Sequence, residues 1–366
     1  MQDVSLTTLF FLFLRMGSIG FGGPIALISL MEQECSEKRK WISLPDFNER
    51  YVFAKLMPGP IASQMAIWMG YHVRGRIGGL VTGVAFLLPA FCLILILSVF
   101  YQTLTSFKNV EPLILGMEAG ALVIIFESVR RMFVPYVKEV QSWTFAIVAS
   151  SLMLFIPRWE PLIILTGGAL IVFYRRIQNK KGLASFALPA LAPVLELFWI
   201  HFKAGFTVFG TGLAAIPVLQ HEVVDIHQWM SSKEFLDGIA FGQITPGPVT
   251  ITSVFIGYKT AGLLGAISAC IGMYGPGAIL ILGVMPLIFY RLKGKPFLAD
   301  FQQGAIPTVI GCIFGAMILL AQTILTPKLL ILVAILTAVS WKAKLPGWAT
   351  ILLGSLLNFG ASFLVA

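Results

Sequence analysis

Two basic residues lie inside apolar stretches of the sequence, where charged side chains are rare. Arg15 lies within Leu9–Met16, and Lys203 lies within Phe198–Ala204. A charge at membrane depth is costly, so it usually faces a cavity, a partner or a substrate. We therefore expect Arg15 and Lys203 to contact an anionic substrate. The alternatives are a snorkelling side chain or a salt bridge to one of three acidic residues, Glu118, Glu127 or Glu196.

Glycine-rich breaks follow both cations within a turn or two. The first break contains Gly22, Gly23 and Pro24, and the second is Gly210-Thr211-Gly212. Glycine and proline interrupt helix hydrogen bonding, and a helix that restarts after such a break has free N–H groups at the positive end of its dipole. Such an end binds anions. These residues are therefore candidates for the same anion site.

Two Pro-Gly-Pro sequences, at residues 58–60 and 246–248, predict a second pair of helix starts. Proline suits the start of a helix, and polar side chains close to it can donate hydrogen bonds to an oxyanion. Close packing of membrane helices is the other explanation for such glycines. The binding residues predicted at these two sequences are Lys55, Gly59, Ser63, Gln64, Gln243, Thr245, Gly247, Thr250 and Thr252.

The remaining acidic residues are weaker candidates. Asp46 and Glu234 follow Ser43 and Ser231 at helix-capping spacing, and for Glu49 and Asp237 we favour capping or a solvated face over proton coupling. Glu118 could relay protons, whereas Glu127 is explained by pairing with Arg130 or Arg131. No phosphate-binding glycine loop and no metal-ligand spacing occurs. We therefore expect no cofactor, no metal and no enzymatic activity.

These candidates occupy equivalent positions in a duplicated sequence. Pro58 and Pro246 are 188 residues apart, and at that offset the match includes Trp41 with Trp229. After a one-residue gap it continues through Gly70-Tyr71 and Gly257-Tyr258. We predict two repeats, residues 1–182 and 183–366. A repeat in a membrane protein is typical of a transporter built from two halves around a central site.

The composition places this repeat in a membrane. The chain is 57% hydrophobic and 12% charged, which is too apolar for an ordinary soluble domain. Apolar runs such as Ile77–Tyr101 approach or reach the length of a spanning helix, and they lack the alternation of barrel strands. The net charge of +9 is spread over short loops, which is typical of orientation signals rather than of nucleic-acid binding.

The loop charges predict an inverted arrangement of the two repeats. Most of the 26 basic residues lie in loops that share one side if each half crosses the membrane five times, with Pro45–Leu56 and Ile61–Tyr71 forming a re-entrant hairpin. Matched loops also exchange sign, since Lys38-Arg39-Lys40 corresponds to Ile226-His227-Gln228. We predict an all-α polytopic membrane protein with about ten transmembrane helices plus two re-entrant hairpins, and with both termini outside.

Several motifs resemble those of the chromate ion transporter family in its two-domain long form. They are Phe21-Gly22-Gly23-Pro24-Ile25-Ala26, Leu56-Met57-Pro58-Gly59-Pro60 and Phe86-Leu87-Leu88-Pro89 in the first half, and Phe202-Lys203-Ala204-Gly205, Phe235-Leu236-Asp237-Gly238 and Gln243-Ile244-Thr245-Pro246-Gly247-Pro248 in the second. Three positions depart from the family pattern. Leu27 replaces a common histidine, Lys55 a glutamine, and Thr211 the middle glycine of a common triplet.

This resemblance implies a secondary active transporter that exports chromate across the bacterial or archaeal cytoplasmic membrane, driven by the membrane potential or the proton gradient. Transport of sulfate or another oxyanion, inward with protons, is the alternative, because sulfate shares the shape and charge of chromate. The expected partners are a chromate- or sulfate-like anion and the lipid bilayer, with no nucleic acid. A homodimer is left open.

Overall fold

The computed structural model describes residues 4–20, 23–107, 110–137, 140–155, 163, 166, 193–208, 212–292, 296–324 and 326–365. These residues form helices and no strand. In the first half the elements are α1 (Leu6–Ile19), α2 (Gly23–Glu32), the π-helix η1 (Gln33–Lys38), α3 (Leu44–Leu56), α4 (Ile61–Ser106), α5 (Glu111–Tyr136) and α6 (Val140–Phe155).

The second half repeats much of this order. Its elements are α8 (Pro193–Thr207), the 3₁₀-helix η3 (Gly212–Ala215), α9 (Ile216–Gln220), the π-helix η4 (His221–Ile226), α10 (Ser232–Ile244), the 3₁₀-helix η5 (Val249–Ile251), α11 (Thr252–Ile279), the π-helix η6 (Leu280–Val284), α12 (Met285–Leu292), α13 (Pro296–Ile324), α14 (Pro327–Ala343) and α15 (Gly347–Val365).

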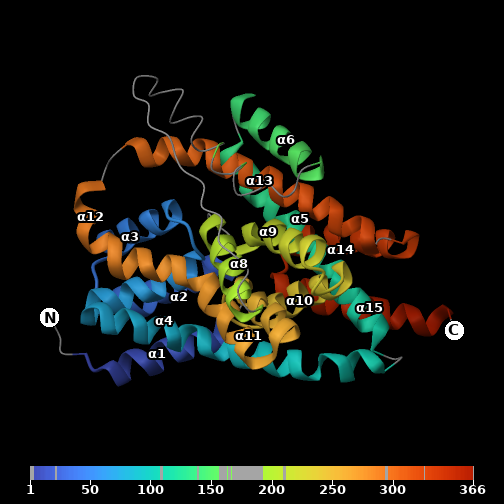
Figure 1. Ribbon diagram of the computed structural model, residues 1–366, viewed down its shortest axis with the longest axis horizontal. Helices are drawn as coiled ribbons and strands as arrows, with labels where there is room; N and C mark the ends of the chain where they lie inside the picture. The colour runs from blue at the N-terminus through green and yellow to red at the C-terminus, as the bar shows by residue number, and fades with distance from the viewer. Residues whose placement is uncertain are drawn as a thin grey trace.

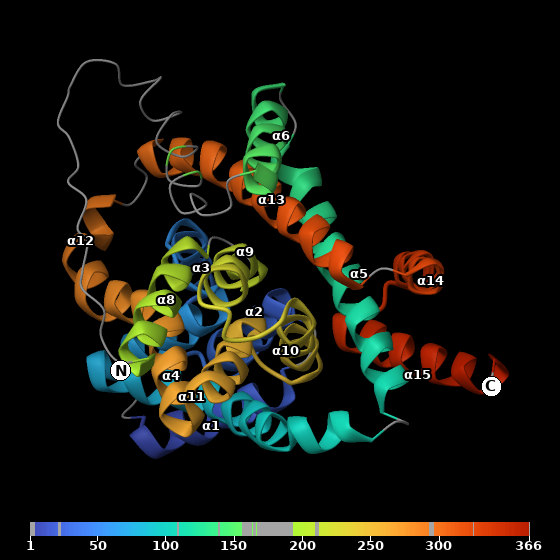
Figure 2. The same ribbon diagram turned by 45° about the vertical axis from the view of Figure 1, so that its right-hand side comes forward.

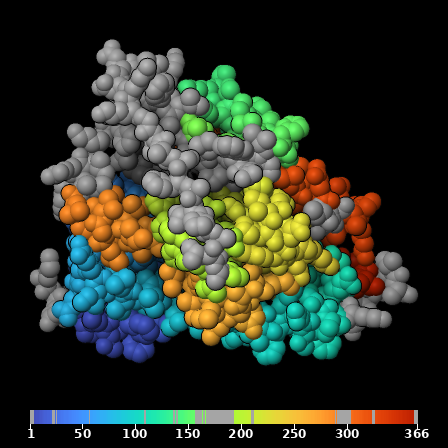
Figure 3. All heavy atoms as spheres, viewed as in Figure 1, coloured from blue at the N-terminus to red at the C-terminus, as the bar shows by residue number. Residues whose placement is uncertain are grey.

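The helices fall into two groups (Figures 1 and 2). The early helices of both halves, α1–α4 and α8–α11, lie together, and α5, α13, α14 and α15 lie beside them. In the first group α1 packs on α4 and α8 packs on α11, while in the second α5 packs on α15 and α6 on α13. Figure 3 shows the yellow and orange atoms of α9–α11 at the front, next to the blue atoms of the first helices.

Equivalent local structures show that the repeat is present in the structure as well as in the sequence. The bounds of η1 and η4 differ by 188 residues, as do those of α3 and α10. Ser43 accepts a hydrogen bond from the backbone N–H of Asp46, and Ser231 accepts one from that of Glu234. Because a capping hydroxyl satisfies a free N–H of the first turn, both predicted helix starts are confirmed.

Both α4 and α11 are two helices that fold back on each other. The chain reverses at Gly75, with φ 62° and ψ −154°, and at Gly262, with φ 60° and ψ −150°. The Thr82 hydroxyl then donates to the carbonyl oxygen of Ala66 at 2.8 Å, from one arm to the other. These reversals lie after Ile61–Tyr71 and its equivalent, whereas the sequence predicted a hairpin of Pro45–Leu56 with Ile61–Tyr71 around the Pro-Gly-Pro. The two re-entrant hairpins therefore stay a prediction.

The described part of the chain contains four helices long and apolar enough to cross a membrane. They are Ile61–Ser106, Glu111–Val134, Val249–Leu287 and Gln303–Gln322. Leu6–Ile19 and Val140–Phe155 are shorter apolar helices. The chain is thus an all-α, multi-pass membrane protein. The number of ten crossings stays a prediction, and the predicted boundary between residues 182 and 183 lies outside the described residues.

Candidate anion site

The two Pro-Gly-Pro loops meet the ends of the first helices, and each meets the helix of the other half. The Gly59 N–H donates to the Val208 carbonyl oxygen at 2.8 Å, and the Gly247 N–H donates to the Gly20 carbonyl oxygen at 3.1 Å. Gly20 follows α1, and Val208 follows α8. The same contact is therefore made in both directions, as local two-fold symmetry requires. It places each Pro-Gly-Pro loop beside the residue after the first helix of the other half, just before a predicted break.

Glycine is needed in both loops because of their backbone conformation and their close neighbours. Gly59 has φ 125° and Gly247 has φ 102°, values that side chains disfavour. A Cβ on Gly59 would stand 3.2 Å from the Cα of Gly277, and one on Gly247 would stand 3.1 Å from the Cβ of Ala90. The second arms of α4 and α11 thus pass directly beside the two loops.

Free backbone donors face this region at the start of α4. A helix leaves its first N–H groups without an acceptor in the helix, and here they belong to Ile61, Ala62 and Ser63, all buried. The N-cap residue, Pro60, makes no side-chain capping bond to them. Buried donors of this kind can bind an oxyanion, as the sequence predicts for this helix start.

The neighbouring hydroxyl groups do not act as the predicted donors in this conformation. Ser63 donates to the Pro60 carbonyl oxygen at 2.8 Å, and Thr252 donates to that of Val249 at 3.0 Å. Thr245 donates to the carbonyl oxygen of Gly242 at 3.2 Å, and Thr250 donates to the Tyr274 hydroxyl at 2.8 Å. Since a hydroxyl has one proton to donate, these four side chains offer an anion only their lone pairs.

The two glutamines differ from the hydroxyl side chains. Gln64 is fully buried and donates from Nε2 to the Pro58 carbonyl oxygen at 2.6 Å, while its Oε1 accepts nothing from the described residues. The buried Nε2 of Gln243 has no hydrogen-bond acceptor there either. An amide nitrogen carries two donors. Gln243 and Gln64 therefore keep donor capacity that the hydroxyl groups have already used.

Each of the two cations, Arg15 and Lys203, interacts with an acidic residue of a π-helix in its own half. Lys203 Nζ contacts Glu222 Oε1 at 2.5 Å, and its side chain is 50% exposed. Arg15 is exposed, and its charge acts on Glu34, which occupies the position equivalent to Glu222. The salt-bridge alternative named Glu118, Glu127 and Glu196; the observed partner of Lys203 is Glu222 instead. Contact with a substrate stays a prediction for both cations.

The other predicted site residues are placed as follows. Lys55 lies in the last turn of α3, with Nζ 4.1 Å from the centre of the Tyr51 ring. Gly23 is the first residue of α2, and Gly212 begins η3 against the Thr250 side chain. Gly22, Gly210 and Thr211 lie outside the described residues.

Comparison with known proteins decides the family. The chromate transporter family model matches residues 7–173 and 195–359. The chain belongs to the chromate transporter family. A chromate transport protein of Cupriavidus metallidurans is 34% identical over 87% of this chain and 83% of its own length. A probable chromate transport protein of Synechococcus elongatus is 32% identical over 91% and 90%, respectively. No solved structure matches.

An uncharacterized transporter of the archaeon Methanocaldococcus jannaschii is 29% identical over 87% of this chain. Such relatives span bacteria and archaea, as the motif resemblance implied. The family consists of transporters, in agreement with the expectation that this chain is not an enzyme.

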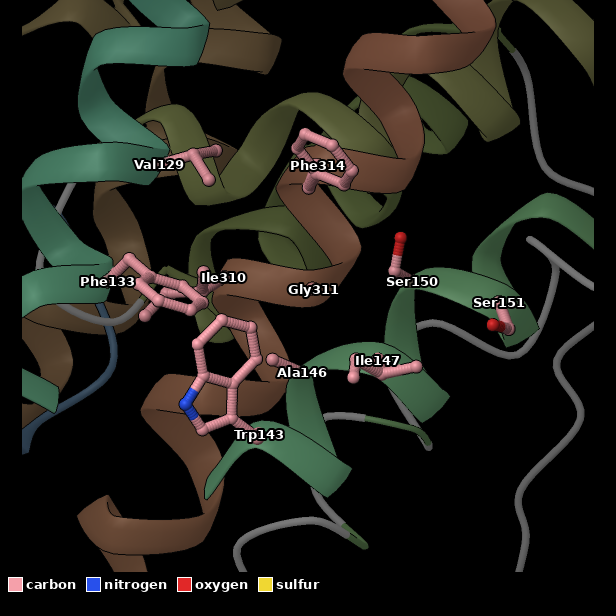
Figure 4. Close-up of a pocket in the computed structure, with 10 residues that line it drawn as sticks. All are labelled: Val129, Phe133, Trp143, Ala146, Ile147, Ser150, Ser151, Ile310, Gly311 and Phe314. Carbon is pink, nitrogen blue, oxygen red and sulfur yellow. The ribbon is translucent and has the colours of Figure 1, made fainter. Parts of the chain in front are cut away.

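One cavity in this chromate transporter family member is unsuited to an anion. It has a volume of about 360 Å³ and lies between α5, α6 and α13 (Figure 4). Its walls include Phe133, Trp143, Ile147 and Phe314, and its polar side-chain groups are the hydroxyls of Ser150 and Ser151 and the indole N–H of Trp143. An anion there would find few donors to replace its hydration. The Pro-Gly-Pro region is therefore the better candidate.

The acidic residues separate into two kinds. Glu127 contacts Arg130 at 2.9 Å and Arg131 at 3.4 Å, which confirms the predicted pairing. The expectation for Asp237 is wrong: it neither caps a helix nor faces solvent, because it is 1% exposed inside the protein. Its hydrogen-bond donor is Tyr101, and Glu118 lies next to it. These three residues come from different helices, so no sequence spacing could reveal them.

Proposed function

We propose that this chain is a secondary transporter that exports chromate, a tetrahedral dianion, across the cytoplasmic membrane. The observation that carries the proposal is the reciprocal pair of hydrogen bonds from Gly59 to Val208 and from Gly247 to Gly20, in a member of the chromate transporter family. Each bond joins a Pro-Gly-Pro loop to the end of the first helix of the other half, next to a predicted helix break. Helix starts there would bind the anion through directional N–H groups.

The exchange of hydrogen bonds between the two halves also supports a mechanism of alternating access. Two-fold related halves can expose one central site to either side of a membrane in turn when the repeats are inverted. The contacts support the two-fold relation, and the charges of the loops favour an axis in the membrane plane. The hairpin reversals at Gly75 and Gly262 would then bring the Pro-Gly-Pro loops to mid-membrane depth from opposite sides.

Export follows from the membrane potential. A negative interior favours expulsion of an anion by about 2.3 kcal/mol per charge per 100 mV, so a dianion gains twice that. Arg15 and Lys203 would attract the anion, although each shares its charge with an acidic residue of η1 or η4 in this conformation. The anion would compete with Glu222 for Lys203, so the lysine would bind either the Glu222 carboxylate or the anion.

Counterflow of labelled chromate and sulfate in proteoliposomes, with and without an imposed potential, tests the proposal. We expect the wild type to exchange chromate and the potential to drive net movement. Arg15→Ala and Lys203→Ala should each reduce chromate movement at equal protein content, whereas the control Lys342→Ala, an exposed basic residue at the end of α14, should not. Unchanged transport in both Arg15→Ala and Lys203→Ala would remove the role of the cations. Movement of sulfate without chromate would replace the proposed cargo.

A further inference from the structure

Two acidic side chains meet inside the protein, away from the Pro-Gly-Pro loops. Glu118 of α5 is fully buried and Asp237 of α10 is 1% exposed, and the two carboxyl groups lie next to each other. Neither oxygen of Glu118 nor Oδ1 of Asp237 has a hydrogen-bond partner among the described residues. Two buried, adjacent carboxylates without donors would repel each other strongly. We therefore expect one of the two groups to be a carboxylic acid.

The neighbouring donor indicates which group holds the proton. The Tyr101 hydroxyl of α4 donates to Asp237 Oδ2 at 2.6 Å. Among the described residues no donor reaches Asp237 Oδ1 or either oxygen of Glu118. A donated hydrogen bond favours the charged form of a carboxyl group, so we expect Asp237 to be the carboxylate and Glu118 to hold the proton. Tyr101, Asp237 and Glu118 together would then hold one negative charge and one removable proton.

The nearest cations already have acidic partners. Lys259 of α11 contacts Glu234 Oε1 at 2.6 Å and lies 4.9 Å from the centre of the Tyr101 ring. Lys233 of α10 lies 3.9 Å from Glu111 Oε1. Both lysines belong to the face that the loop charges predict to be outside. These lysines can raise the local concentration of anions. Because Glu234 and Glu111 already pair with them, they do not replace the proton that the buried pair shares.

The other surroundings of the pair are apolar. The rings of Phe241 and Phe255 pack edge-on against Tyr101 at centroid distances of 6.1 Å and 5.2 Å. The described side chains of α13 include one titratable group, the Cys312 thiol, and α15 has none. Two adjacent negative charges would be strongly disfavoured in such a place. Loss of the proton must therefore come with a local change, either entry of water or separation of α5 from α10.

A movement of α10 would reach the anion site directly. The helix runs from Ser232 to Ile244, so Asp237 lies about 10 Å along it from the end that leads into the Pro-Gly-Pro loop. That loop carries Gly247, whose N–H is bound to Gly20 of the other half. Asp237 thus sits on the helix that connects the outer face to the central contact.

We propose that Glu118 and Asp237 form the proton-binding site that couples oxyanion transport to the proton gradient. A proton from outside water forms an O–H bond with the Glu118 carboxylate, and its release to water after the conformational change restores that carboxylate. Only the second repeat supplies this buried acid, because its first-repeat equivalent, Glu49, is half-buried on α3. One chain would therefore bind one coupling proton. This inference rests on the proposed function for its cargo.

The experiment uses Glu118→Gln and Asp237→Asn, with Glu49→Gln as the matched control at the equivalent position. In proteoliposomes we expect all four proteins, wild type included, to exchange chromate without a gradient. A pH gradient should drive net chromate movement in the wild type and in Glu49→Gln. It should have no effect in Glu118→Gln or Asp237→Asn. Gradient-driven movement that persists in both variants would overturn the inference.

Infrared difference spectra of the purified proteins, recorded during a pH titration, separate this inference from the proposed function. The C=O band of a protonated carboxyl group should titrate in the wild type and in Glu49→Gln and should be absent from the other two variants. An unchanged band in both of those variants would overturn the proton site, even if chromate is transported. If the wild type moves neither chromate nor sulfate, the proposed function fails, while loss of the band in both variants would still support proton binding at this pair.

Discussion

At the scale of single residues, the sharpest constraint in this chain is on glycine at the two hairpin reversals. Gly75 and Gly262 have positive φ together with ψ near −150°. That combination is almost restricted to glycine, and holding another residue there costs of order 1–3 kcal/mol. No atom lies within 4 Å of the position where a Cβ would stand on either glycine. Conformation, and not space, therefore requires glycine at both reversals.

Replacement of Gly262 by alanine should destabilise the protein by about 1–3 kcal/mol. The matched control is Gly283→Ala in η6, where a Cβ also meets nothing within 4 Å and φ is not positive. That control should be neutral or stabilising by up to about 1 kcal/mol, because alanine reduces the entropy of the unfolded chain. Unfolding of both variants in detergent, followed by circular dichroism, compares them. Equal effects of the two substitutions would contradict this account.

The contact between Lys203 and Glu222 gives a second prediction for single residues. If Lys203 serves the anion, Glu222→Gln should leave chromate transport in place, because it frees the lysine, while Lys203→Ala should reduce transport. If Lys203 serves only the salt bridge, the two substitutions should have the same effect on transport and on stability. Counterflow rates and unfolding midpoints of both variants decide between these outcomes.

The sequence predicted single residues unevenly. The caps at Ser43 and Ser231 and the pairing of Glu127 were predicted correctly, because the partners lie within four residues of each other. Asp237 was misplaced because its partners, Tyr101 and Glu118, lie more than a hundred residues away. The donor roles of Ser63 and Thr252 were predicted from residue type alone, which does not show where a hydroxyl proton points.

At the scale of elements, the end of the first helical stretch is a π-helix, η1, stabilised by ion pairs. Lys38 donates to Glu34 Oε1 at 2.8 Å. This bond holds the pKa of Glu34 below its ordinary value of 4.5, against the opposing effect of burial, and Arg39 and Arg15 add to the lowering. A lowered pKa in the folded protein means that the contribution to stability is present above pH 4.5 and is lost as the pH falls further.

Substitution of Glu34 by glutamine should therefore cost stability at pH 7 but have little effect near pH 3. The loss at pH 7 should be about 1 kcal/mol or less, because the Lys38 side chain is 61% exposed and solvent screens the pair. Glu37→Gln, on the exposed side of the same π-helix, is the control. Urea unfolding at the two pH values measures both variants. A difference between wild type and Glu34→Gln that grows in acid would have the wrong sign.

Helix boundaries were easier to predict than helix trajectories. The sequence indicated a break at each Pro-Gly-Pro and a hairpin before each long helix, since proline and glycine act on the local backbone. It did not indicate that each loop would bind the first helix of the other half. That choice depends on how two apolar halves pack, and apolar surfaces carry no directional information.

At the scale of the whole molecule, the inverted arrangement predicts opposite locations for equivalent loops. Residues 38–40 should lie on the cytoplasmic side and residues 221–227 on the outer side. Single cysteines introduced at Lys40 and at His227, labelled from outside with an impermeant reagent, should react at His227 alone before lysis. The four native cysteines, Cys35, Cys92, Cys270 and Cys312, would first be replaced by serine or alanine. Reaction at both positions, or at Lys40 alone, would rule out the predicted orientation.

The exchanged hydrogen bonds of Gly59 and Gly247 have a consequence for assembly. Each half carries one donor glycine and one acceptor carbonyl, and each donor binds the acceptor of the other half. Either half, made as a separate polypeptide, would therefore be incomplete in the membrane until it met a second half. The covalent link between the repeats then ensures a supply of the correct partner, and an ancestor with one repeat would have had to work as a dimer.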